Sequence, residues 1–250
     1  MKIVDMHAHV DVMEAFNWVD TPEKLVRLMD EAGIAYSIAT AYSNWPARDP
    51  IALERLCVSL EPYRDRLFPF VRMDPGYGAK AIELLEEGKR NFGIKGLKLH
   101  PTDYTLHPFG AFTVNLVRRA GELGLPVLLH CGDEVMSYPL QIGEMARQCP
   151  DTTVIMAHMG GVFHTRDALT VARRHPNVYV DTSEIPHVAP VRMFVDAIGP
   201  ERVLFGTDAP YCDHLVELEK VRLAGLTDEE FACVCSRNGL RLLGLDGGKA

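Results

Sequence analysis

The sequence predicts a single-domain α/β protein with the architecture of a (β/α)8 TIM barrel. The chain has 250 residues, about the usual length of such a barrel. Eight short apolar segments alternate along it with amphipathic segments, a pattern that predicts parallel strands connected by helices. Each strand–helix unit takes roughly 31 residues, the span of one βα repeat, and eight units close into a barrel. We therefore expect residues 1–250 to form one domain.

The eight predicted strands are short and continuously apolar rather than alternating. This pattern is typical of strands that are covered on both faces, as in a barrel surrounded by helices. The predicted strands are residues 3–6, 36–40, 68–71, 94–99, 127–129, 154–157, 178–180 and 203–205.

Helices are predicted between these strands by their start and end signals. Thr21 and Pro22 supply an N-cap and a first-turn proline. Gly33 and Gly124 each follow an amphipathic segment, where a glycine commonly ends a helix. Residues 227–230 read as a capping box that opens the last helix.

The main alternative is an open, doubly wound sheet. That fold would place a glycine-rich phosphate-binding loop after the first strand. Residues 6–9 read Met-His-Ala-His instead, so the sequence favours the closed barrel.

Composition and charge exclude several functional classes. The formal net charge is −8 and no basic cluster offsets it, so we expect no nucleic-acid partner. No apolar run of about 18 residues is present, and no signal-peptide core precedes Asp5 and His7, so we expect no membrane association and a cytoplasmic location. The six scattered cysteines indicate free thiols rather than a disulfide framework. The helices around such a barrel could also support a homo-oligomer.

Two histidines, His7 and His9, follow directly on the first predicted strand. On an extended chain this i, i+2 spacing puts both imidazoles on one face, with their Cα atoms roughly 7 Å apart. Two neutral imidazoles at the end of a buried strand can bind a single metal ion. The alternative is a pair of incidental surface histidines.

Further ionisable residues also fall at strand ends. His130 and His158 end the fifth and sixth predicted strands, and Asp208 follows the eighth. All carboxyl ends of the strands in a βα barrel face one mouth, where active sites form. Three histidines and an aspartate form a ligand set that suits zinc and, less selectively, manganese, iron or cobalt.

These segments resemble the amidohydrolase superfamily, and within it the amidohydrolase-2 branch of metal-dependent barrel hydrolases and decarboxylases. The resemblance covers nearly the entire chain. The segments that carry it are residues 5–9, 96–101, 125–130, 157–160 and 205–208.

The resemblance implies that His7, His9, His130 and Asp208 bind a divalent metal ion. His158 would be a ligand of a second metal ion, or an acid or electrophile facing the substrate. In relatives with two metal ions a carboxylated lysine bridges them, and Lys98 is the residue that matches it. One ion is favoured over two.

The expected activity is hydrolysis of a small lactone, ester or amide by a metal-activated water. Asp208 would accept the proton of this water, and His158 would polarise the scissile carbonyl. The alternatives are non-oxidative decarboxylation of an aromatic or vinylogous acid, and an inactive barrel that only binds a ligand.

Three further strand-end residues could bind a carboxylate on the substrate: Arg72, Lys98 and His100. Each also has a structural interpretation. Arg72 could pair with Asp74, a neighbouring acid could neutralise a buried Lys98, and His100 could simply end its strand.

Overall fold

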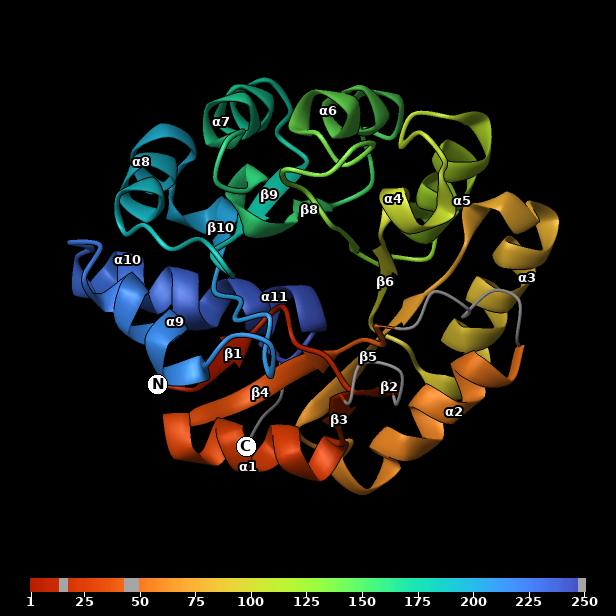
Figure 1. The fold of residues 1–250 in the computed structure, drawn as a ribbon, viewed down its shortest axis with the longest axis horizontal. Helices are drawn as coiled ribbons and strands as arrows, with labels where there is room; N and C mark the ends of the chain where they lie inside the picture. The colour runs from red at the N-terminus through yellow and green to blue at the C-terminus, as the bar shows by residue number, and fades with distance from the viewer. Residues whose placement is uncertain (14–17, 43–49, 247–250) are drawn as a thin grey trace.

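The computed structural model describes residues 1–13, 18–42 and 50–246. Its main sheet has eight parallel strands that wind around a central axis, with helices outside them (Figure 1). The strands, in sheet order, are β1 (Ile3–Asp5), β4 (Ile34–Ala39), β5 (Leu67–Arg72), β6 (Gly96–Leu99), β7 (Val127–Leu129), β8 (Val154–Met156), β9 (Val178–Asp181) and β10 (Val203–Leu204). All eight predicted strands are thus found, and the fold is the predicted (β/α)8 TIM barrel.

The segments that follow β1 and β10 contact each other and close the barrel. The amide of Met6 donates to the carbonyl of Phe205 at 2.9 Å, and a parallel bridge joins Ala8 to Ala209. These contacts bring the segment after β1 against the segment after β10, so residues from opposite ends of the chain become neighbours.

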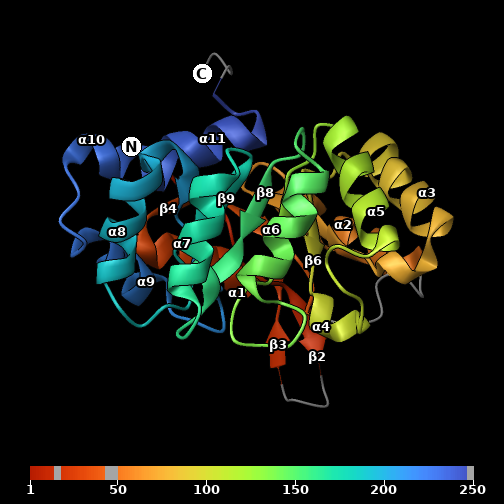
Figure 2. The same cartoon turned by 90° about the horizontal axis from the view of Figure 1, so that it is seen from above.

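Helices cover the outside of the barrel (Figures 1 and 2). The α-helices are α1 (Pro22–Ala32), α2 (Pro50–Leu60), α3 (Ala79–Glu87), α4 (Pro101–Tyr104), α5 (Ala111–Glu122), α6 (Pro139–Gln148), α7 (Thr165–Arg174), α8 (Ala189–Ile198), α9 (His214–Arg222), α10 (Asp228–Ala232) and α11 (Asn238–Leu243). Shorter 3-10 or π segments are η2 (Glu61–Tyr63), η3 (Pro75–Tyr77), η4 (Gly88–Phe92), η5 (Ala157–Gly160), η6 (Pro200–Arg202) and η7 (Cys233–Arg237).

The predicted capping residues of two helices are confirmed. The Thr21 hydroxyl accepts from the amide of Lys24, and Gly33 ends α1 with a left-handed φ of 70°. At the start of α10, Thr227 and Glu230 form the predicted capping box, in which each side chain bonds to the other residue's backbone amide.

Two apolar cores stabilise the fold. The inner core fills the barrel with side chains such as Met6, Phe70 and Ile155, and Leu243 of α11 packs against it. The larger outer core lies between the strands and the helices. Figure 2 shows α11 at one end of the barrel and α4 at the other, the carboxyl end of the strands. Polar side chains, rather than the inner core, occupy the carboxyl end of the barrel.

A small antiparallel hairpin, β2 (Asp11–Met13) and β3 (Trp18–Asp20), projects from the carboxyl end of the barrel (Figure 2). It follows directly on the segment that carries His7 and His9. Within the described ranges, no helix has the length and apolar character needed to cross a bilayer. All six cysteines are free thiols, as predicted.

Candidate metal centre

The structure brings together His7, His9 and Asp208 at the mouth of the barrel. Their ligand atoms lie within 4.8 Å of one another, and all three side chains are buried. The Nε2 atom of His9 lies 2.9 Å from Oδ1 of Asp208, and Nε2 of His7 lies 3.2 Å from the same oxygen. Side chains separated by about 200 positions in the sequence therefore share one small volume.

The buried carboxylate of Asp5 holds the two segments that carry these residues. It accepts hydrogen bonds from the amide of His7 at 3.0 Å and from the amide and hydroxyl of Thr207 at 3.0 and 2.6 Å. The amide of Asp208 also donates to the carbonyl of His7 at 2.7 Å. Asp5 thus fixes how the end of β1 lies against the segment after β10.

Lys98 lies inside the barrel and is 1% exposed. Its Nζ atom is 2.9 Å from Nε2 of His7. Burial lowers the pKa of Lys98 to about 8, and the nearby carboxylates of Asp208 and Asp181 oppose that shift. The interpretation of Lys98 as a buried lysine beside acidic groups agrees with this geometry.

His130 and His158 lie beside this group but form a separate contact. Nε2 of His158 is 3.2 Å from Nδ1 of His130, and the ring of His158 is 5.0 Å from that of His7. His100 stacks on His130 with ring centroids 4.0 Å apart. In the described residues, three of the four predicted ligands share one cluster, and His130 belongs to a neighbouring cluster with His100 and Glu134.

The guanidinium of Arg72 is paired inside the protein. It forms an ion pair with Asp103 and donates to the carbonyl of Tyr42 at 2.6 Å. Asp74, the partner suggested from the sequence, accepts from the amide of Gly76 and caps the short helix η3. His100 directly follows β6 and precedes α4, so it also marks the end of its strand.

Asp181 is a site residue that the sequence analysis missed. It is the last residue of β9, is fully buried, and its Oδ2 lies 3.0 Å from Nδ1 of His7. Its other oxygen accepts from the amide of His158 at 3.1 Å and from Ser183. Asp181 directly follows the seventh predicted strand, residues 178–180. It is therefore an ionisable strand-end residue of the same kind as His130 and His158.

Burial keeps the imidazoles of the site neutral. It lowers the pKa of His7, His9 and His158 well below the usual value, and that of His130 to about 3. Burial also raises the pKa of Asp208 to about 7. Neutral imidazole is the form of histidine that binds metal ions.

The donor atoms of the first cluster fit a divalent cation. Because Asp181 occupies the Nδ1 side of His7, the Nε2 lone pair of His7 faces Oδ1 of Asp208 across 3.2 Å. Two acceptors at this separation repel each other unless a proton or a cation lies between them. Imidazole nitrogens and a carboxylate oxygen are the ligands that zinc and manganese accept.

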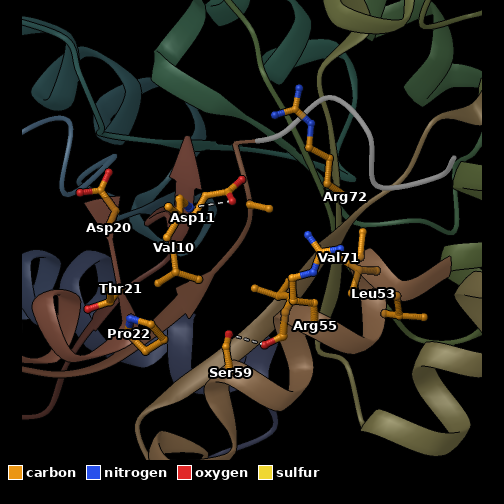
Figure 3. Close-up of a pocket in the computed structure, with 14 residues that line it drawn as sticks. Val10, Asp11, Asp20, Thr21, Pro22, Leu53, Arg55, Ser59, Val71 and Arg72 are labelled. Carbon is orange, nitrogen blue, oxygen red and sulfur yellow. Dashed lines mark hydrogen bonds between the residues drawn. The ribbon is translucent and has the colours of Figure 1, made fainter. Parts of the chain in front are cut away.

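Two cavities flank the mouth. The first has a volume of about 180 Å³ and is lined by His130, His158, Glu134 and Glu184, among others. The second, of about 270 Å³, lies between the β2–β3 hairpin and α2. In Figure 3, Asp20, Thr21 and Pro22 line one side of it, and Leu53, Arg55, Val71 and Arg72 line the other.

The buried histidines predict that the metal-free protein loses stability in mild acid. The unfolded chain protonates histidines below a pH of about 6.5, whereas the folded protein keeps five of them neutral. Three carboxyls oppose this loss of stability, because burial raises their pKa to about 7 in the folded protein. On acidification the folded protein therefore takes up these protons before the unfolded chain does. The histidines are His7, His9, His100, His130 and His158, and the carboxyls are those of Glu184, Asp208 and Glu217.

Between pH 6 and pH 5 the unfolded chain therefore binds about two more protons than the folded protein. Because the Glu184 side chain is 38% exposed, solvent screens its opposing effect, and the free energy of unfolding should fall by at least about 2 kcal/mol across that unit of pH. Urea unfolding of chelator-treated protein at several pH values measures this slope. Constant or rising stability between pH 6 and pH 5 would contradict it.

Eight parallel strands with histidines and carboxylates gathered at their carboxyl ends define the class of (β/α)8-barrel enzymes. The chain matches the amidohydrolase family model over residues 4–245, and it belongs to that family. Among curated proteins, none matches the chain.

Several solved structures share the fold. The 2,6-dihydroxybenzoate decarboxylase from Rhizobium is 17% identical with a TM-score of 0.79, and the match covers 98% of this chain and 99% of that one. A dihydroxybenzoic acid decarboxylase from Polaromonas sp. JS666, with bound manganese, is 17% identical with a TM-score of 0.78 (99% and 98% covered). A probable 2-pyrone-4,6-dicarboxylic acid hydrolase from Acinetobacter baumannii is 15% identical with a TM-score of 0.72 (98% and 100% covered).

Proposed function

We propose that the protein is a metal-dependent hydrolase that cleaves a C–O or C–N bond in a small lactone, ester or amide. His7, His9 and Asp208 would bind one divalent ion, with His130 as a fourth ligand. The cluster of two imidazoles and a carboxylate within 4.8 Å of one another is the observation that carries this proposal. Zinc is the first candidate, and the manganese bound in the Polaromonas structure makes manganese the second.

When bound, such an ion with an open coordination position supplies a water molecule of lowered pKa. Asp208 would be the residue that accepts a proton from the attacking water and returns it to the leaving group. A carboxylate beside that water is the kind of group that general-base catalysis requires.

His158 would line the substrate site without donating to the carbonyl oxygen, because Ser183 and Glu184 hold the proton of its imidazole on Nδ1. It borders the 180 Å³ cavity, which would receive the substrate. Lys98 and His100 supply contacts for an acidic group of the substrate. Arg72 contributes to the wall of the site, because Asp103 already neutralises its charge.

Decarboxylation is the second candidate, since several structures of the same fold are decarboxylases of hydroxybenzoates. In that reaction the substrate carboxylate would lie at the metal ion beside Lys98, and a protonated Asp208 would deliver a proton to carbon. The two reactions use the same residues but differ in their products.

Metal analysis combined with a substrate panel tests both candidates. We expect purified protein to contain about one divalent ion per chain and to hydrolyse members of a panel of lactones, esters and amides, detected by acid release at constant pH. Release of CO₂ from 2,6-dihydroxybenzoate without hydrolysis of the panel would favour the decarboxylase. A protein that binds no zinc or manganese would contradict both.

A further inference from the structure

The carboxylate of Asp181 accepts four hydrogen bonds at the base of the candidate metal centre. Its Oδ2 faces Nδ1 of His7 at 3.0 Å. Its Oδ1 accepts from the amides of His158 and Ser183 at 3.1 and 3.0 Å, and from the Ser183 hydroxyl at 2.5 Å. The side chain is fully buried, so water does not compete for these oxygens.

The contact with His7 fixes one tautomer of that imidazole. A carboxylate can only accept, so Nδ1 of His7 must carry the proton. Nε2 then presents its lone pair to Asp208 and Lys98, at 3.2 and 2.9 Å.

The contact with Ser183 transmits the same constraint to His158. Because the Ser183 hydroxyl gives its proton to Asp181, its oxygen can only accept from Nδ1 of His158, 2.9 Å away. The carboxylate of Glu184, 3.4 Å from the same nitrogen, favours the same tautomer. His158 therefore carries its proton on Nδ1, and its Nε2 is an acceptor.

His130 is the last histidine in this chain of hydrogen bonds. Its Nδ1 lies 3.2 Å from the acceptor Nε2 of His158, so the proton of His130 must also lie on Nδ1. Nε2 of His130 then presents its lone pair, with Oε2 of Glu134 3.8 Å away.

We propose that Asp181 is a positioning residue that sets the tautomers of His7, His158 and His130. Through it, Nε2 of His7 and Nε2 of His130 both present lone pairs. The link to metal binding rests on the proposed function, but the tautomers themselves are a property of the metal-free protein. The network also orients His158, whose backbone has a φ of 57° that non-glycine residues rarely adopt.

Long-range ¹H–¹⁵N correlation spectra of protein labelled on its histidines report each tautomer. We expect His7, His130 and His158 of the metal-free protein to be protonated on Nδ1. A spectrum with any of the three protonated on Nε2 would overturn the assignment.

Two variants separate the two branches of the network. The first branch runs from Asp181 to His7, and the second runs from Asp181 through Ser183 to His158 and His130. In Asp181→Asn, an oxygen must stay at the Oδ1 position to accept from the amides of His158 and Ser183, so the NH₂ group faces His7. We expect His7 alone to move its proton to Nε2. In Ser183→Ala/Glu184→Ala, which removes both acceptors for Nδ1 of His158, we expect His158 and His130 to lose their single tautomer while His7 keeps its own.

Zinc affinity, measured by competition with a chelating dye, gives a second readout. Asp181→Asn should weaken zinc binding by about 10–100-fold. Unchanged His7 signals in that variant would overturn the proposal, and should it fail to fold, the double variant tests the second branch alone. Wild-type protein that binds no zinc but has the expected tautomers would contradict the proposed function and leave the role of Asp181 supported.

Discussion

Replacing Asp208 by asparagine should lower turnover by about 10²–10⁴-fold, the contribution typical of a general acid–base group. The asparagine oxygen can keep the position of Oδ1 beside His7 and His9, and turnover is expressed per bound metal ion so that any loss of metal is accounted for. The amide cannot accept a proton near neutrality, whereas a carboxylate can. Steady-state kinetics together with elemental analysis measure both quantities.

Asp213→Asn is the matched control for this variant. Asp213 caps α9 by accepting from the amides of Leu215 and Val216, and asparagine is an equally good N-cap. The control therefore makes the same chemical change five residues away without touching the cluster. Near-normal turnover in Asp208→Asn with a full metal complement would remove Asp208 from proton transfer.

The barrel and the position of its mouth could be predicted from the sequence because both depend on local patterns. A strand covered on both faces must be apolar along its whole length, and each such segment shows this directly. The place of His7, His9 and Asp208 then follows, since residues at the carboxyl ends of parallel strands converge whatever their distance in the sequence. The structure confirms this convergence for the three residues.

The partners of buried charges could not be predicted in this way. Arg72 pairs with Asp103 of α4, a partner that the strand and helix patterns of the sequence do not indicate. Asp5 lies within β1, at its carboxyl end, where only the closing of the barrel brings Thr207 to it. Such choices depend on three-dimensional distances that periodicity does not contain.

The β2–β3 hairpin was not predicted for a different reason. Each of its strands has only three residues, too few for an alternating pattern to be distinguished from a loop. The hairpin nevertheless matters for the site, because it forms one side of the 270 Å³ cavity beside Arg72.

Replacing His9 by glutamine should abolish stable metal binding and, with it, the activity. Nε2 of His9 lies 2.9 Å from Asp208, and stacking on Tyr42, with centroids 4.0 Å apart, fixes the orientation of the ring. Glutamine has neither the imidazole lone pair nor the planar ring that stacks. Loss of a direct ligand should cost more than the loss of a group that only supports one, so we expect affinity to fall by more than about 100-fold.

His164→Gln makes the same substitution at the start of α7, where the histidine contacts Asp167 and lies outside the three histidine-containing clusters of the described residues. We expect this control to bind metal like the wild type, and we expect chelator-treated wild type to recover activity when zinc or manganese is added back. Addition of the same ions to His9→Gln should restore nothing at concentrations that saturate the wild type. If His9→Gln instead bound one ion per chain with wild-type affinity, His9 would not be a ligand, and the ion would have to lie in one of the two clusters of the described residues that lack His9.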